Sequence, residues 1–306
     1  MENTDAEIQD GTETGADEVL VPKSATPVLA EVMLAVEELW PASLAEDWDA
    51  VGLVVGRPRA EVSKILFAVD PTADVVAEGL DWGADLIIAH HPLLLHGVNS
   101  VAATTAKGKV VHELIENGCA LMTVHTNGDS AVGGVSDVLA DVLGLEEVVP
   151  LQAARHGLPE EGVGRVGLLP SAMTLGDLAA ALFGVLPAVA GGLRVAGDRQ
   201  ALVRRIAVCG GAGDSLFSAV RAQGADVYIT ADLRHHPASE ARDGSVDGRP
   251  YLMDLSHFAS EWLWLPAAAK ALGNVLQDQG FEVELRVSQV NTDPWDFILT
   301  PGFDQE

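Results

Sequence analysis

The sequence predicts an α/β protein with two similar lobes, each built on a mixed or mainly parallel sheet. Short apolar strands alternate with helices along most of the 306-residue chain, a pattern typical of strand–helix–strand units. A stretch richer in charge and glycine, 144–164, marks the boundary between the lobes. The halves also share a faint echo, because Gly-Ala-Asp, a strand and His-His-Pro follow one another at 83–92 and again at 224–237. A duplicated unit would explain this echo, and chance is the alternative.

Composition limits the function classes. A chain of 306 residues that is 48% hydrophobic can bury a large core. The formal net charge of -27 argues against nucleic acid as a partner, since phosphate backbones demand a basic surface, and against anionic membranes. We find no signal peptide and no apolar run near the roughly 20 residues that span a bilayer. Two cysteines, 119 and 209, indicate a reducing compartment, so we expect a cytoplasmic protein.

The first lobe is expected over 25–147, after an acidic tail at 1–24 that we predict to be disordered. Thr26 followed by Pro27 is typical of a helix start, and Pro41 ends that helix. Apolar runs bounded by turn residues then predict strands at 52–56, 64–69, 85–89 and 120–124, with helices at 72–82, 105–116 and 133–143.

The second lobe is expected over 148–306. The same patterns predict strands at 163–169, near 193, at 205–209, 226–230, 251–254 and 281–287, and helices at 174–185, 214–223 and 266–279, with a short one before 251.

The stretch Asp85-Leu-Ile-Ile-Ala-His-His-Pro92 is the most informative for function. Its apolar run indicates a buried strand, and ligands of open α/β sheets bind beyond the carboxyl ends of such strands. Neighbouring side chains on a regular strand point to opposite faces. His90 and His91 can therefore converge only if the chain bends there, or if each serves a different ion. A pair of structural histidines is the alternative.

The sequence Ser256-His-Phe-Ala-Ser-Glu261 is the strongest local pattern. Ser256 can cap a helix, which puts His257 and Glu261 four residues apart on one face. An imidazole and a carboxylate at that spacing can share a metal ion, although a surface hydrogen bond would use the same spacing. Two tryptophans follow, and a carboxylate in such apolar surroundings needs a partner.

Three further polar features lie near strand ends. Asp129 closes a polar loop after a strand and is a ligand or a turn residue, and His125 could be a ligand, a supporting group or a core histidine. Cys209-Gly-Gly-Ala-Gly-Asp214 resembles a phosphate-binding loop but lacks the third glycine of the dinucleotide fingerprint and the lysine of a P-loop, which favours a tight turn. Three histidines and two carboxylates suit a two-metal site better than one structural ion.

With these residues collected, the chain resembles the dinuclear-metal proteins known as type 2 homologues of GTP cyclohydrolase I, or the NIF-three-like family. The resemblance covers Pro27 to the C-terminus and depends on an ordered set of motifs: Trp48-Asp-Ala-Val-Gly-Leu53, Ala89-His-His-Pro-Leu93, His125-Thr-Asn-Gly-Asp129, Val208-Cys-Gly-Gly-Ala-Gly-Asp-Ser215, Tyr228-Ile-Thr-Ala-Asp-Leu233, and His257 with Glu261.

The resemblance implies a set of metal ligands: His90, His91, Asp129, His257 and Glu261, with Glu261 bridging two divalent ions (zinc, iron, manganese or similar) in the cleft between the lobes. It also implies a homohexamer, without the inserted domain that some members carry. Two departures, Ala50 where asparagine is common and Gly128 where a larger apolar residue is common, remove no ligand.

Two functions remain open from the sequence. The first is a metal-dependent hydrolase acting on a nucleotide-like substrate, at a purine ring carbon or a phosphoester, with His125 and His236 as candidate proton carriers. The second is a metal-binding scaffold or regulatory hexamer without turnover.

Overall fold

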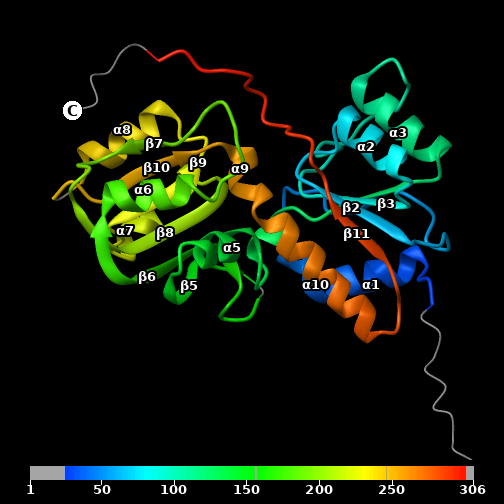
Figure 1. The fold of residues 1–306 in the computed structure, drawn as a ribbon, viewed down its shortest axis with the longest axis horizontal. Helices are drawn as coiled ribbons and strands as arrows, with labels where there is room; N and C mark the ends of the chain where they lie inside the picture. The colour runs from blue at the N-terminus through cyan, green and yellow to red at the C-terminus, as the bar shows by residue number, and fades with distance from the viewer. Residues whose placement is uncertain (1–24, 156, 246, 301–306) are drawn as a thin grey trace, which may run out of the picture.

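The computed structural model describes residues 25–155, 157–245 and 247–300, and the predicted disordered tail at 1–24 lies outside them. The described chain forms two lobes, each with one sheet covered by helices on both faces (Figure 1). Both sheets mix parallel and antiparallel pairs, so the predicted fold class is confirmed. Among the described residues, no helix is both long and apolar enough to cross a membrane.

The first sheet has five strands in the order β1-β4-β3-β2-β11. All neighbouring pairs are parallel except β1 with β4. Its strands are β1 (Gly52–Val55), β2 (Lys64–Ala68), β3 (Leu86–Ala89), β4 (Ala120–Thr123) and β11 (Glu284–Val287). The helices around it are α1 (Leu29–Leu39), α2 (Ala73–Trp82), α3 (Ala106–Glu116) and α10 (Trp264–Asp278). A short 3-10 turn, η1 (Ala42–Leu44), follows α1.

Strand β3 shows why this sheet needs helices on both faces. All four of its residues are buried, and successive side chains enter different cores. Leu86 and Ile88 pack in the cluster formed with α1 and α10, whereas Ile87 and Ala89 pack in the cluster formed with α2 and α3. The continuous apolar run is therefore the signature of a central parallel strand.

The second sheet has six strands in the order β5-β6-β8-β9-β10-β7. Only β8, β9 and β10 pair in parallel, and the other pairs are antiparallel. The strands are β5 (Glu146–Ala153), β6 (Gly162–Thr174), β7 (Arg194–Ala196), β8 (Leu202–Ala212), β9 (Val227–Ala231) and β10 (Tyr251–Leu255). Helices α5 (Val135–Val142) and α6 (Leu175–Phe183) cover one face. Helices α7 (Phe217–Ala222) and α8 (His235–Asp243) cover the other face, and the 3-10 turn η2 (Asp214–Leu216) directly precedes α7.

The predicted division at 147/148 implies that the chain passes between the lobes once, but the chain returns to the first lobe near its C-terminus. Helix α10 packs on α1, and β11 pairs in parallel with β2, so the C-terminal segment completes the first sheet although we placed it in the second lobe. Strand β5 occupies residues 146–153 of the predicted boundary stretch, 144–164. Helix α1 begins at Leu29 rather than at Thr26, and the Val28 N–H donates to the Glu31 carboxylate at 2.8 Å.

Candidate metal centre

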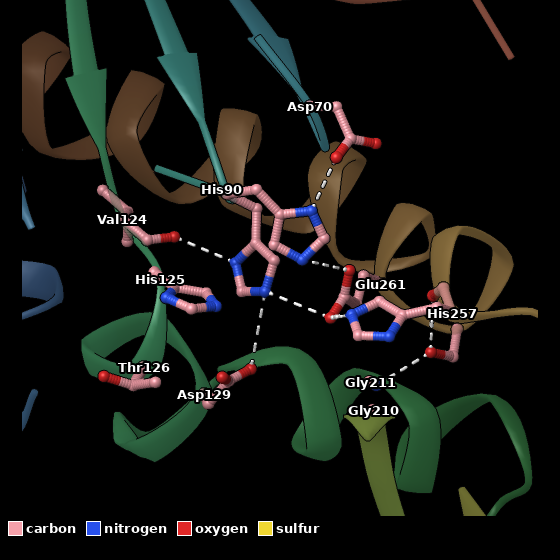
Figure 2. Close-up of polar contacts among 12 residues, drawn as sticks. Asp70, His90, Val124, His125, Thr126, Asp129, Gly210, Gly211, His257 and Glu261 are labelled. Carbon is pink, nitrogen blue, oxygen red and sulfur yellow. Dashed lines mark hydrogen bonds and ion pairs between the residues drawn. The ribbon is translucent and has the colours of Figure 1, made fainter. Parts of the chain in front are cut away.

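The two histidines that follow β3 converge because the chain bends at that point. The backbone N–H groups of His90 and His91 still donate to the carbonyls of Ala68 and Val69, at the end of the neighbouring strand β2, at 2.9 and 2.8 Å, but neither histidine has strand geometry. Their rings lie 5.1 Å apart, and both Nε2 atoms face the same carboxylate (Figure 2). The condition set by the sequence, a bend at the end of the strand, is therefore met.

That carboxylate belongs to Glu261, which lies 3% exposed on the short helix α9 (His257–Trp262). Ser256 caps this helix as predicted, because its hydroxyl accepts the N–H of Ala259. Glu261 lies 2.9 Å from Nε2 of His257, 3.1 Å from Nε2 of His91 and 3.5 Å from Nε2 of His90. Ligands held about 2 Å from one ion lie roughly 3 to 3.5 Å from each other, so these spacings fit a shared cation.

The far side of each imidazole is fixed by an oxygen acceptor. Nδ1 of His90 lies 2.9 Å from the carbonyl oxygen of Val124, and Nδ1 of His91 lies 2.7 Å from the Asp70 carboxylate. Nδ1 of His257 lies 2.7 Å from the Asp232 carboxylate. Because these oxygens can only accept, each Nδ1 carries a proton and donates it. Metal-binding histidines are oriented in this way, with Nε2 left for the ion.

A fourth imidazole, His125, follows the same rule. Its Nδ1 lies 2.8 Å from the Asp49 carboxylate, and its ring lies 5.2 Å from that of His90 and 5.4 Å from that of His91. A nitrogen of His125 lies within 4.8 Å of ligand atoms of both these histidines, so the three could hold an ion. Of the three roles that the sequence left open for His125, the geometry favours ligand.

Asp129 lies on a one-turn helix, α4 (Thr126–Ser130), where the sequence predicted a loop. Asp49 holds the start of this helix by accepting both the N–H and the hydroxyl of Thr126. Oδ1 of Asp129 lies 3.8 Å from Nε2 of His90, farther than Glu261 does. Asp129 therefore borders the cluster next to His90 (Figure 2).

The cluster contains buried polar atoms without hydrogen-bond partners, and its ionisable groups have shifted pKa values. Among the described buried side chains, His90 Nε2 and Glu261 Oε2 have no hydrogen-bond partner. Burial alone would raise the pKa of Glu261, but the three imidazoles hold it well below its usual range. Burial would likewise lower the pKa of His257 and His91, yet the Glu261 carboxylate raises them to about 9 and about 11. Burial raises the pKa of Asp129.

In the described part of the chain, no lysine or arginine forms an ion pair with the carboxylates of the cluster. The carboxylates of the cluster are Asp49, Asp70, Asp129, Asp232 and Glu261, and in the part of the chain that the structure describes their ion pairs are with histidines alone. Buried charge needs a partner, and a divalent ion that replaces the Nε2 protons would supply it.

The glycine-rich stretch at 209–214 serves the site by being small rather than by binding phosphate. It belongs to β8 and its end, not to the predicted tight turn. Gly211 has φ +66°, and a Cβ added there would lie 2.5 Å from Oε1 of Glu261 and 3.3 Å from Nε2 of His257. Its N–H donates to the Ser260 hydroxyl at 2.9 Å, which ties β8 to α9.

A cavity of about 800 Å³ opens beside the cluster. His91 and His257 form part of its wall, together with their supporting residues Asp70 and Asp232. The lining also has apolar and aromatic residues: Phe258, Trp295, Phe297 and Ile298. A ligand in this cavity would therefore touch the exposed side of the histidine cluster.

The structure thus brings together the five predicted ligands and adds groups that sequence reasoning missed. Asp70 follows β2 at the same edge of the sheet where His90 follows β3, but that position alone does not separate a supporting group from a turn residue. Asp232 lies in the motif Tyr228-Ile-Thr-Ala-Asp-Leu233, to which no role was assigned from the sequence. His235 and His236 lie exposed at the start of α8 and belong to neither histidine cluster found among the described residues, so His236 is not supported as a proton carrier.

Comparison with known proteins was made after this geometry. The family model for Duf34/NIF3 (NGG1p interacting factor 3) matches residues 27–294. The "GTP cyclohydrolase 1 type 2 homolog" of Streptomyces coelicolor is 51% identical over 271 residues, covering 88% of this chain and 94% of that protein. The homolog of the same name from Mycobacterium leprae is 33% identical and covers 87% and 94%; its alignment of 372 positions exceeds this chain's length, so it has residues with no counterpart here.

Among solved structures, a Bacillus cereus protein related to NIF3 has a TM-score of 0.82 at 25% identity, covering 90% of this chain and all of that one.

Proposed function

The chain belongs to the Duf34/NIF3 family, and from this premise we propose that it is a dinuclear divalent-metal protein that acts as a hydrolase on a nucleotide-like substrate. The observation that carries the proposal is the convergence of His90, His91 and His257 on the Glu261 carboxylate, with every Nδ1 held by an oxygen acceptor.

The donor set fits about two borderline divalent ions, such as zinc, iron or manganese, rather than one. Glu261 has two oxygens that face different imidazoles, Oε1 toward His257 and His90, and Oε2 toward His91. It can therefore bridge two ions. Asp129 and His125 flank the same space and would complete the two coordination spheres. We propose this site, between ligands from the first sheet and ligands from α9, as the metal cleft.

Two such ions would lower the pKa of a bound water, and their positive charge would lie beside the attacked group. The protein's own part is to fix the ligands and to exclude alternatives. Asp70 and Asp232 orient His91 and His257, whose outer edges line the cavity. Burial of His90 and Glu261 keeps bulk water from competing for these groups. The substrate would enter through the cavity and meet the site from the side of His91 and His257.

The cavity wall supports a substrate with a flat ring. Phe258, Trp295 and Phe297 provide aromatic surface, on which purine-like rings stack. Arg194 lies in the same wall, bonded to Asp254 and still largely exposed, which would suit an anionic substituent. This combination favours a nucleotide-like molecule over an uncharged aliphatic one.

A turnover assay tests the proposal. The metal-loaded protein is incubated with a panel of nucleotides and phosphoesters, and products are followed by chromatography. We expect hydrolysis of at least one compound, and Glu261→Ala should abolish it because the bridging carboxylate is lost. Product formation that is unchanged in Glu261→Ala would refute the assignment of the site.

A second candidate, a metal-binding scaffold without turnover, is favoured by one observation. Residues Trp295, Phe297, Ile298 and Leu299 are 57–85% exposed, and a group of exposed apolar residues of this kind marks an interaction surface. We propose that the protein assembles as a homohexamer, as its resemblance implies. Sedimentation of the purified protein checks this assembly, and a metal-loaded hexamer that turns over none of the panel would favour the scaffold.

A further inference from the structure

The segment after β11 runs from the first lobe to the second (Figure 1). On the first lobe, the Ser288 N–H donates to the carbonyl of Phe67 at 2.8 Å, and the Gln289 N–H donates to Glu78 of α2 at 3.0 Å. On the second lobe, the Asn291 amide donates to the carbonyl of Ala188 at 3.2 Å. We call residues 288–295 the strap.

The strap touches the support of His91. Asp70 holds Nδ1 of His91 through Oδ1, and its other oxygen, Oδ2, accepts the hydroxyl of Thr292 at 2.5 Å. Both oxygens of the Asp70 carboxylate therefore accept a hydrogen bond, and the carboxylate cannot rotate without breaking one of these hydrogen bonds. Its position sets the direction in which Nε2 of His91 points.

The next residue of the strap touches the support of His257 and Glu261. Oδ2 of Asp293 accepts the hydroxyl of Ser256, the residue that caps α9. The other oxygen of Asp293 accepts the N–H of Trp295 at 3.0 Å, which anchors the carboxylate within the strap. The Ser256 hydroxyl is thereby oriented with its lone pairs toward the N–H of Ala259 at 3.2 Å.

Two adjacent residues therefore reach the two halves of the metal centre, one through Asp70 and one through the cap of α9. We propose that Thr292 and Asp293 are positioning residues, which hold His91 at a fixed distance from the α9 ligands His257 and Glu261. This inference rests on the proposed function, because it presupposes that the cluster binds metal. Supports of metal ligands typically contribute 10–100-fold in affinity, through orientation rather than through new contacts to the ion.

The test compares single variants by their affinity for Co²⁺ and by the visible spectrum of the bound ion. Thr292→Val removes the hydroxyl and keeps the shape, whereas Thr292→Ser keeps the hydroxyl. Asp293→Ala releases Ser256. Gln289→Ala is the matched control in the same strap, since that side chain bonds only to the carbonyl of Val287 among the contacts described. Thermal melting of each metal-free protein separates ligand geometry from folding.

We expect Thr292→Val and Asp293→Ala to bind Co²⁺ about 10-fold more weakly and to shift its spectrum. Thr292→Ser and Gln289→Ala should match the wild type in both. The inference is overturned if both loss variants bind Co²⁺ as the wild type does, including when their metal-free melting temperature falls, or if Thr292→Ser is as weak as Thr292→Val. A wild-type protein that binds no metal would instead refute the proposed function itself.

Discussion

Glu261 can lie among three imidazoles because the strand that faces it has no side chain at position 211. A Cβ at Gly211 would lie 2.5 Å from Oε1 of Glu261, too close for any stable contact. We therefore expect Gly211→Ala to displace Glu261 and to reduce the bound metal by at least half, as measured by elemental analysis after dialysis.

The matched control for that variant is Gly224→Ala. Both glycines have left-handed backbones, with φ +66° and +62°, so both variants incur a similar strain of about 1 kcal/mol. Nothing lies within 4 Å of the added Cβ at Gly224. Equal metal loss in the two variants would show that backbone strain, and not the contact with Glu261, is responsible.

Cys119 provides a pH dependence that is separate from the metal site. Burial, with a smaller contribution from Asp85, raises the pKa of this thiol to about 12. Above pH 9 the unfolded chain releases the thiol proton while the folded protein keeps it, so the unfolded state binds fewer protons and stability falls as pH rises. We expect the free energy of unfolding of the wild type to drop by about 1 kcal/mol more than that of Cys119→Ala between pH 9 and 10. Parallel pH profiles of the two proteins in urea titrations would contradict this pKa.

At single positions, the sequence pointed to the clustered histidines and Glu261 better than to the groups that support them. His90, His91, His257 and Glu261 could be found because residue type, strand ends and helical spacing are local signals. Asp70 and Thr292 could not, since their roles depend on a contact between residues 222 positions apart. A lone aspartate after a strand has no sequence feature that separates a support from a turn residue.

Between elements, the pair Arg165–Asp137 joins β6 to α5 next to α4, the helix that carries Asp129. The guanidinium of Arg165, 1% exposed as a residue, donates to Asp137 and to the carbonyls of Gly162, Gly164 and Ala131. Arg165→Met removes these hydrogen bonds and leaves the Asp137 carboxylate without its ion-pair partner, which should cost about 3 kcal/mol of the free energy of unfolding in urea.

A surface pair serves as the control for that measurement. The Arg155 and Asp47 side chains form a 3.0 Å pair but are 75% and 91% exposed, so Arg155→Met should change stability by less than about 0.5 kcal/mol. A loss below about 1 kcal/mol for Arg165→Met would mean that water replaces the arginine and that the pair does not join the two elements.

Most helices and strands were predictable, and those missed have identifiable reasons. The central strands β2, β3 and β4 are fully or almost fully buried, which gives the apolar runs seen in the sequence. Strand β5 lies at a sheet edge, is mostly exposed and contains Pro150, so it has no apolar signature. Helix α4 is one turn of polar residues, held by Asp49 and not by its own pattern.

For the whole molecule, the two-lobe fold could be predicted but the path of the chain could not. Parallel pairing of β11 with β2 joins segments about 220 residues apart, and periodicity carries no information on pairing partners. This return of the chain matters for function, because it brings α10 and the strap back to the lobe that carries His90 and His91. The proposed metal centre therefore depends on the complete fold.

The most direct test of the account is the metal content of three proteins after dialysis. We predict about two divalent ions per chain in the wild type. Glu261→Gln keeps the volume but removes the charge that offsets the repulsion between two close cations, so it should lose at least one ion. His112→Ala should lose none, because His112 lies on the surface of α3 beside Glu116, away from the cluster. A Glu261→Gln protein that retains the wild-type metal content would contradict the central claim that this carboxylate bridges the centre.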